Sequence, residues 1–479
     1  MNEIRLHNTM TNKLEALQPL QKNEVRMYTC GPTVYDFAHI GNFRTFVFQD
    51  VLRRFLRSRG FRMMQVMNLT DVDDRIIQNA AAAGITIREY TEKYVQAFLE
   101  DMQALHLETP EEIVRATDHI DDMVALIEKL QKKGLTYTSD GSIYFSIAKF
   151  PRYGRLSKID LSGMQAGARV DVDRYEKADA RDFALWKSPK PGEHFWETRI
   201  GPGRPGWHIE CSAMAMKYLG DMLDIHTGGV DLAFPHHENE IAQSEAATGR
   251  TFVRLWLHAE HLIIEGEKMS KSLGNFFTLR DLFAKGQKPS TVRYLLLSVP
   301  YGRQLNFTQD SLKQAESSVV RLRNFVARLQ SEQFPAGSTP EMQKRSEEAE
   351  NDFDAGLADD LNTAVALAAV FDLVRDVNTA MDRGMFRQQD AMRVVAAMEK
   401  FDGILAVLAD DDADTLRRLG VAGTLSGIAP AQVDALIEER NAAKKRRDFQ
   451  RADAIRQQLA DSGIILEDRK DGTVRWKHK

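Results

Sequence analysis

The order of apolar segments near the N-terminus is the feature that most constrains the fold. Residues Val25–Cys30 alternate around apolar positions and run into Gly31-Pro32, which predicts a short strand followed by a turn. A helix is expected over about Phe43–Ser58, and the apolar run Phe61–Met67 predicts a second strand. Strand, helix and strand in this order favour a Rossmann-type parallel α/β sheet.

The pattern changes further along the chain. Residues 113–140 look helical, and residues 140–205, rich in Gly and Pro, resemble an irregular insertion between two halves of the sheet. A short strand, Met222–His226, marks the return of the α/β pattern. From Leu312 onward apolar residues recur every three or four positions, which predicts a helical bundle. The expected buried stripes are Leu312, Ala315, Val319, Leu322, Val326 and Leu329; Leu361, Val365, Ala368, Phe371 and Val374; and Met392, Val395, Met398, Phe401, Leu405 and Leu408.

These changes predict five segments. Residues 1–115 form the first half of the Rossmann-type catalytic domain, residues 116–205 a connective insertion, and residues 206–310 the second half. Residues 311–425 form a helical bundle, and residues 426–479 a small C-terminal domain. A chain of 479 residues is too long for one hydrophobic core, so several units are expected.

Composition narrows the class of protein. No stretch approaches the ~20 unbroken apolar residues of a membrane span, and residues 1–21 lack an apolar signal core. We therefore expect a cytoplasmic protein with no membrane partner. The net charge of −5 argues against a protein that coats nucleic acid generally, but it leaves room for a local basic patch.

Two motifs are suited to nucleotide chemistry. His39-Ile40-Gly41-Asn42 comes just before a predicted helix, whose N-terminus favours phosphate, although a simple helix cap would explain the tetrapeptide equally well. Lys268-Met269-Ser270-Lys271-Ser272 places two cations where they can reach phosphate oxygens, whereas most short Lys/Ser runs are solvated loops. Together, and in this order, the motifs resemble the paired ATP signatures of class I aminoacyl-tRNA synthetases.

The two cysteines of the chain are candidate metal ligands. Cys30 ends the first predicted strand, where ligand sites of open α/β sheets gather. With Cys211, and with His236 and Glu240 on one helix face, it would complete a plausible zinc shell. The alternatives for the cysteines are two buried core thiols or a disulfide, which a cytosolic compartment disfavours. The alternatives for the helix are a hydrophilic helix start or the competing pair His237 and Glu238, which are adjacent and face different ways.

The segments around these residues resemble the family of cysteinyl-tRNA synthetases from about residue 3 to the end of the chain. The resemblance is carried by residues 27–36 (MYTCGPTVYD), 68–74 (NLTDVDD) and 203–211 (GRPGWHIEC), and by the segment of His236. It implies one zinc ion per chain, held by Cys30, Cys211, His236 and Glu240 and binding the thiolate of substrate cysteine. It also implies Mg²⁺ with ATP and an amino-acid pocket that includes Thr70 and Trp207. The residues implied to bind ATP are His39, Gly41, Asn42, Gly229, Asp231, Lys268 and Lys271. Within that set His39, Asn42, Lys268 and Lys271 would be catalytic.

The C-terminal tail is the candidate tRNA-binding region of the chain. Residues 440–479 contain 12 Lys/Arg and 6 Asp/Glu, an excess of +6 in an acidic chain, which suits phosphate binding, although a solvated helix face would have a similar composition. The tail resembles the anticodon-binding domain of the family, which implies tRNA(Cys) as partner. The candidate contacts are Arg440, Lys445, Arg446, Asp453, Arg456, Asp468 and Trp476.

Two departures and two alternatives remain. Asn42 stands where the family usually has histidine, and Arg75 and Gln78 stand where many members have lysines, so any persulfide chemistry that needs those lysines is in doubt. One alternative is a ligase that joins activated cysteine to an amino sugar, but such relatives lack the full basic tail. The other is a non-catalytic tRNA-binding or zinc-storage protein, against which His39, Lys268 and Lys271 argue.

Overall fold

The computed structural model describes residues 2–158, 182–270, 274–421, 430–446, 448–461, 464–468 and 474–478. The chain divides into two compact units. The larger contains residues 1–278 and 290–409, and the smaller contains residues 279–289 and 410–479. Among the described residues, no helix is long and apolar enough to cross a membrane.

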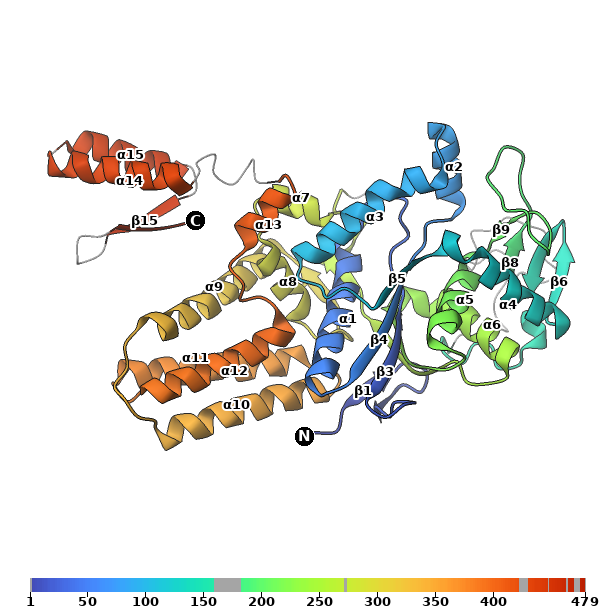
Figure 1. The fold of residues 1–479 in the computed structure, drawn as a ribbon, viewed down its shortest axis with the longest axis horizontal. Helices are drawn as coiled ribbons and strands as arrows, with labels where there is room; N and C mark the ends of the chain where they lie inside the picture. The colour runs from blue at the N-terminus through green and yellow to red at the C-terminus, as the bar shows by residue number, and fades with distance from the viewer. Residues whose placement is uncertain are drawn as a thin grey trace. The chain divides into compact units, whose positions relative to one another are not determined.

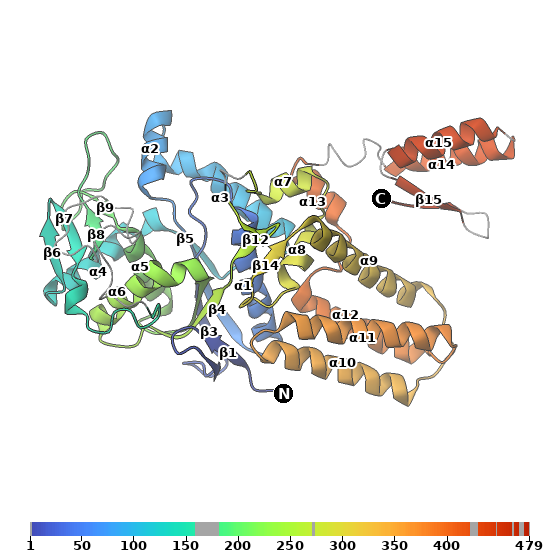
Figure 2. The same cartoon turned by 180° about the vertical axis from the view of Figure 1, so that it is seen from behind.

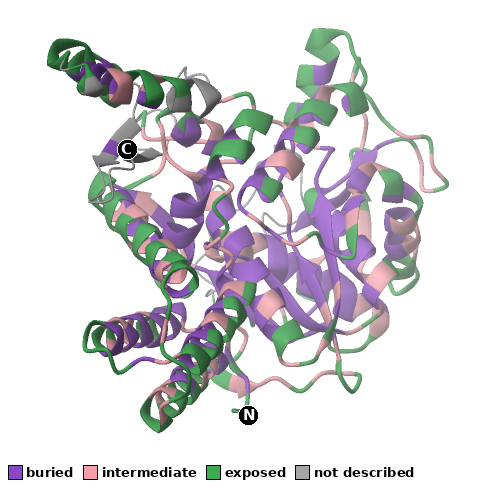
Figure 3. Cartoon of the chain, turned by 60° about the vertical axis from the view of Figure 1, so that its left-hand side comes forward, coloured by how far each residue is buried: buried purple, intermediate pink, exposed green. Residues whose placement is uncertain are grey.

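A five-stranded parallel sheet forms the centre of the larger unit, which confirms the predicted Rossmann-type architecture (Figure 1). Its strands are buried, as expected for a parallel sheet with helices on both faces (Figure 3). Their order is β11 (Val253–Ala259), β10 (Leu223–Gly229), β3 (Glu24–Thr29), β4 (Arg62–Leu69) and β5 (Glu112–Arg115).

Helices cover both faces of this sheet. Helix α1 (Ile40–Ser58) connects β3 to β4, and α5 (Trp207–Leu219) contacts β3 and β4 from the other face (Figure 1). Helix α6 (Glu238–Thr248) connects β10 to β11. Because the chain leaves β3 toward β4 on one side and β10 joins on the other, the carboxyl ends of β3 and β10 flank a topological switch point, where α/β sheets bind ligands.

The expected helix over residues 113–140 is wrong at both ends. Residues Glu112–Arg115 form β5, because the β-branched Ile113 and Val114 extend the sheet and pair with Met67 and Asn68. The helix that follows, α4, covers only Ile120–Lys132. A further strand then begins at Thr136.

The Gly- and Pro-rich insertion is more regular than expected. Strands β6 (Thr136–Ser139), β7 (Ser142–Phe145), β8 (Phe183–Lys187) and β9 (Arg204–Pro205) form an antiparallel sheet in that order. The stacked rings of Phe145 and Phe183, whose centroids are 5.1 Å apart, support it. Glycine and proline therefore mark the turns of a small sheet, and residues 159–181 lie outside the described part.

Shorter elements complete the α/β part of the larger unit. Its N-terminal hairpin is β1 (Arg5–Asn8) and β2 (Lys13–Ala16), and α2 (Asp74–Ala83) and α3 (Ile87–Ala104) lie between β4 and β5. A second small sheet is formed by β12 (Leu262–Ile264), β13 (Glu267–Lys268) and β14 (Leu305–Phe307), and α8 is Pro289–Leu297.

The predicted bundle consists of α9 (Gln309–Ser331), α10 (Pro340–Ala358), α11 (Thr363–Asp382) and α12 (Gln388–Leu405) (Figure 2). Its first stripe is nearly as predicted, with Phe325 buried in place of Val326. In α11, however, Val365 and Ala368 are exposed, and in α12 Met392 is exposed. Since α11 is apolar on several faces, more than one stripe satisfies the spacing, and the buried one contains Ala366, Val370, Leu373, Val377 and Ala380.

The smaller unit contains α7 (Leu279–Ala284), α13 (Asp412–Arg418), α14 (Pro430–Lys445), α15 (Phe449–Asp461), β15 (Ile464–Asp468) and β16 (Val474–His478). The last two strands form an antiparallel pair. A small core of Ile437, Ile455, Leu459 and Leu466 joins the two long helices to β15.

Candidate metal centre and nucleotide site

The four predicted metal ligands come together. Cys30 follows β3 and Cys211 lies on α5. His236 lies in the short helical turn Ala233–His237 just before α6, and Glu240 lies in the first turn of α6. All four are buried, and their Sγ, imidazole nitrogen and carboxylate atoms lie within 4.8 Å of one another. The i, i+4 spacing of His236 and Glu240 does place both side chains on one side, with Nε2 and Oε1 3.1 Å apart.

This donor set fits a metal ion. Among the described residues, the buried Oε1 of Glu240 has no hydrogen-bond partner, although the His236 nitrogen is close to it. The lone pairs of His236 Nε2 and Glu240 Oε1 can therefore both be directed toward a metal ion that lies between them. Two thiols, one imidazole and one carboxylate are ligands that zinc takes in four-coordinate sites.

The charges of the cluster are strongly coupled. Burial lowers the pKa of the His236 imidazole, but Cys211 and Glu240 raise it, to about 10. Burial opposes ionisation of Glu240, but His226 and His236 hold the pKa of its carboxyl down, to about 2. The hydrogen bond with Cys30, together with burial, raises the pKa of the Cys211 thiol well above its usual range. A divalent cation bound among these residues would satisfy the same negative charge that raises the pKa of His236.

The histidines that surround this cluster were not predicted as ligands, and His237 entered only in a competing pair with Glu238. The Nε2 atom of His226 lies 3.0 Å from Glu240 Oε2, and His237 Nε2 lies 3.4 Å from Cys30 Sγ. The other nitrogen of His237 lies 2.7 Å from His258. Cys30, His226, His237 and Glu240 form a second group with metal-ligand geometry. The density of histidine in the strand and helix segments on either side of Glu240 was the signal available.

The structural role of Glu238 was not predicted, because the residue was considered only in that competing pair or as part of a hydrophilic helix start. Its carboxylate is buried and accepts hydrogen bonds from the backbone N–H groups of Gly154, Leu156 and Ser157, at 2.8, 3.0 and 2.9 Å. It therefore fixes the first turn of α6, which carries Glu240, to the insertion.

Both predicted pocket residues lie beside these elements. The Trp207 ring is 40% exposed and stacks on His236, with centroids 4.4 Å apart. Thr70 is buried just beyond β4, where its backbone pairs with Pro32 and Val34 on the segment that follows Cys30. The exposed Trp207 ring next to the cluster and the Thr70 hydroxyl beside the segment after Cys30 are suited to form walls of a small pocket.

The first nucleotide motif caps α1. The Nδ1 atom of His39 accepts a hydrogen bond from the Asn42 backbone N–H (3.1 Å), and the Asn42 side-chain oxygen accepts one from the His39 backbone (3.0 Å). Because Nδ1 is an acceptor, the proton of neutral His39 is on Nε2, which is then a donor. A Cβ atom at Gly41 would lie 3.0 Å from both the His39 ring and Met269 Cε, so the position requires a small residue.

The second motif lies against the first. The N–H of Ile40 donates to the carbonyl of Phe277, just beyond the lysine-rich loop. Asn275 accepts from the Ser270 N–H at 2.7 Å and donates to the Lys268 carbonyl at 3.2 Å, which fixes one end of that loop. Lys268 is exposed, whereas Lys271 lies outside the described residues.

The predicted adenosine residues lie at the end of β10. A Cβ at Gly229 would be 2.5 Å from the Asp231 carboxylate, and one at Gly228 would be 2.8 Å from the His237 ring. Both glycines therefore allow close approach of their neighbours to the backbone. Asp231 lies at the switch point between β10 and β3, where a carboxylate can accept a ribose hydroxyl.

The predicted tRNA residues of the smaller unit differ in exposure. Arg446, Asp453 and Arg456 are exposed. Arg440 is only 2% exposed, because its side chain lies inside the unit, so it has little surface for a phosphate contact. Three further candidates fall outside the part described at side-chain level: Lys445, Asp468 and Trp476.

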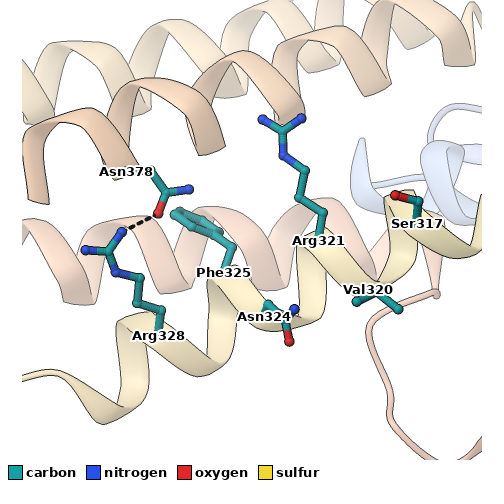
Figure 4. A pocket seen from close by; sticks show the side chains of 7 residues that line it. All are labelled: Ser317, Val320, Arg321, Asn324, Phe325, Arg328 and Asn378. Carbon is teal, nitrogen blue, oxygen red and sulfur yellow. Dashed lines mark hydrogen bonds between the residues drawn. The ribbon is translucent and has the colours of Figure 1, made fainter. Parts of the chain in front are cut away.

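A groove of about 390 Å³ lies on the bundle, away from both nucleotide motifs (Figure 4). Its residues are Ser317, Val320, Arg321, Asn324, Phe325, Arg328 and Asn378. Arg328 already bonds to Asn378 and Asp382, and the Arg321 guanidinium lies over the Phe371 ring. We assign no ligand to this groove.

Comparison with known proteins first identifies the class. The family model described as tRNA synthetases class I (C) catalytic domain matches residues 16–317, and a DALR domain matches residues 352–409. The fold is that of methionyl-tRNA synthetase from Mycobacterium tuberculosis, with a TM-score of 0.58, 16% identity, and 86% and 95% of the two chains covered. Sheet, paired motifs and matches together define a class I aminoacyl-tRNA synthetase.

More similar relatives identify the family. The cysteine–tRNA ligase of Solibacter usitatus is 59% identical over 99% of this chain and 100% of its own length. That of Koribacter versatilis is 56% identical over the same shares. Residues 428–476 match the cysteinyl-tRNA ligase anticodon binding domain. The chain therefore belongs to the cysteine–tRNA ligase family.

Proposed function

We propose that this chain activates L-cysteine with ATP to cysteinyl-adenylate and then transfers the cysteinyl group to the 3′ end of tRNA(Cys). The observation that carries the proposal is the buried group of Cys30, Cys211, His236 and Glu240 at the end of β3, a few residues from the His39 motif. A cluster suited to binding sulfur would thereby be joined by a short segment to residues suited to binding a nucleotide. The first half-reaction needs both.

The four clustered residues would hold one zinc ion. A zinc ion with thiolate ligands stabilises a substrate thiolate better than an alcohol, because sulfur is the softer ligand and the thiol loses its proton near pH 8.5 or below. Thr70 and the exposed Trp207 ring would form the walls around the amino acid. Selection would then rest on ligand chemistry rather than on size.

The remaining residues would bind and orient ATP. His39 would donate from Nε2 to a phosphate oxygen, since its Nδ1 is occupied by the Asn42 N–H. The Lys268 and Lys271 ammonium groups would stabilise negative charge on the transferring phosphate. Asp231 would accept a ribose hydroxyl beside Gly229. Mg²⁺ would accompany the nucleotide and screen its phosphates.

The smaller unit would bind the tRNA anticodon. Arg446, Asp453 and Arg456 offer exposed charge for phosphates and base edges. We propose residues 426–479 as this domain, following the bundle of residues 311–425, the catalytic halves of residues 1–115 and 206–310, and the insertion of residues 116–205. Removing residues 426–479 should spare activation of cysteine and abolish efficient charging.

Pyrophosphate exchange tests the first step. With ATP and cysteine the chain should exchange labelled pyrophosphate into ATP without tRNA. With serine the exchange should be at least ~10⁴-fold slower, as when a polar group of a site is left unmatched. Comparable exchange with serine would contradict selection by the metal cluster. Charging of tRNA(Cys) tests the second step and distinguishes this activity from a ligase that uses an amino sugar.

A further inference from the structure

Aromatic and basic side chains gather where α2 and α3 meet the segment between Cys30 and His39. We call them the aromatic–basic patch: Tyr35, Phe37, Arg75, Tyr90, Lys93 and Tyr94. The Phe37 and Tyr94 rings meet edge to face with centroids 5.3 Å apart, and Tyr90 and Tyr94, one turn apart on α3, are 5.6 Å apart. Figure 1 shows α2 and α3 joined end to end at the edge of the larger unit.

The patch is anchored by hydrogen bonds. The Tyr90 hydroxyl donates to the Tyr35 carbonyl at 3.1 Å, and the Asn79 amide donates to the same hydroxyl at 2.9 Å. Residues from α2, from α3 and from the segment after Cys30 are therefore held together. A preorganised surface loses little conformational entropy when a ligand binds.

The patch combines an exposed ring, and others that are half-buried, with two exposed cations. Phe37 is 39% exposed, and Arg75 and Lys93 are exposed. Neither cation forms an ion pair with a carboxylate of the described residues; instead Arg75 lies 5.2 Å from the Tyr35 centroid, and Lys93 lies 4.6 Å from that of Tyr94. Rings that stack bases, with cations that meet phosphates, are what proteins use for unpaired RNA.

The position of the patch indicates which RNA it binds. Tyr35 and Phe37 lie on the segment that begins at the metal ligand Cys30 and ends at His39 of the nucleotide motif. In the second step of the proposed function, a ribose hydroxyl must reach the adenylate held between these two residues. The nucleotides just before that ribose are unpaired, so they pass this segment with free bases and phosphates.

We propose that the aromatic–basic patch binds the unpaired 3′ end of the tRNA acceptor arm. A base stacks on the exposed ring of Phe37, which Tyr94 supports edge to face, and Arg75 and Lys93 meet the phosphates on either side. This site rests on the proposed function, and it is separate from the anticodon contacts expected in the smaller unit. An acidic protein segment would meet the two cations but would leave the rings unused.

The test compares two RNAs on the full-length chain. One is tRNA(Cys), and the other is the same tRNA without its unpaired 3′ nucleotides. Phe37→Ala should weaken binding of the complete tRNA about 5- to 100-fold, the range that loss of one stacked base produces, and should not change binding of the shortened tRNA. Phe37→Trp should restore binding, because it returns a larger ring. Cysteine-dependent pyrophosphate exchange, which needs no tRNA, should stay at the wild-type rate in both variants.

The cations are tested by salt dependence. Lys93→Gln should reduce the slope of log affinity against log salt by about one for the complete tRNA only. Arg88→Gln is the matched control, because Arg88 is exposed on the same helix but its guanidinium is paired with Asp118 at 2.8 Å. It should leave that slope unchanged.

Two results would overturn the site: equal weakening of both RNAs by Phe37→Ala, or an unchanged affinity of the complete tRNA in both Phe37→Ala and Lys93→Gln. Failure of the proposed function would look different, since the wild-type chain would then show no cysteine-dependent exchange.

Discussion

Helices α6 and α11 both pack against buried parts of the larger unit, but they do so in different ways. Helix α11 buries a stripe of apolar residues against the bundle, as the three- and four-residue spacing of such residues predicts. Helix α6 buries nearly every residue, including Glu238, Asn239, Glu240, Gln243, Ser244 and Glu245. No hydrophobic periodicity could predict that burial.

Several buried polar groups of α6 meet specific partners. Glu240 faces the His226 and His236 imidazoles, and Glu238 accepts three backbone N–H groups. Gln243 donates to the His208 carbonyl and to Ser212 at 2.9 and 3.0 Å. Burial of polar groups is costly unless such partners exist, so a helix of this kind is retained for its chemistry rather than for its packing.

The largest expected effect is at the metal cluster. Cys211→Ser should reduce zinc content and cysteine-dependent exchange together, by more than the about 10- to 100-fold that loss of an outer partner of a metal ligand costs. Metal analysis and exchange kinetics on the same preparation measure both. Met214→Leu, a buried volume-conserving change on the same helix, is the control and should leave both unchanged. Full zinc occupancy in Cys211→Ser would remove it from the ligand set.

These residues also show how far the sequence could be read. Cys30, Cys211, His236 and Glu240 lie together in the structure as the sequence predicted, because two scarce cysteines and a helical spacing restrict the choices; their role as zinc ligands stays a prediction. His226 and Glu238 were not found, because their partners come from distant segments and leave no local pattern. The stripe of α11 was misplaced at Val365, because an alanine- and valine-rich helix has several equivalent stripes and only tertiary packing selects one.

The second-largest effect is expected on the free energy of unfolding, with zinc content and exchange rate unchanged. Leu373 is fully buried in α11, so Leu373→Ala should lower the free energy of unfolding of the larger unit by about 2–5 kcal/mol, the usual cost of a core cavity. Denaturant titration followed by circular dichroism measures the change. At a temperature where the variant is folded, its zinc content and exchange rate per molecule should match the wild type. A fall in zinc content there would mean that bundle packing and the cluster are coupled.

A smaller effect is expected one step away from the ligands. Glu238→Gln replaces a carboxylate that accepts three N–H groups by an amide with one oxygen, so the first turn of α6 should be held less firmly. We expect zinc affinity to fall about 10- to 100-fold, as for other residues that support a metal ligand. Competition with a chelator measures it. Glu348→Gln on α10, an exposed site with the same charge change, should have no effect. If the two variants behave alike, the contacts to residues 154–157 do not support the cluster.

The smallest effect is expected where the sequence pattern and the structure disagree. Val365 is 47% exposed on α11, whereas Val370, five residues later on the same helix, is fully buried. Valine and serine have similar helix propensities, so replacing either valine by serine isolates the burial of the side chain. Val365→Ser should change the free energy of unfolding by less than about 0.5 kcal/mol, as surface substitutions usually do. Val370→Ser should cost more than about 2 kcal/mol, because it removes buried methyl groups and buries a hydroxyl. Denaturant midpoints of the two variants give the comparison directly. A loss at Val365 as large as that at Val370 would mean that the predicted stripe, rather than the observed one, faces the bundle core.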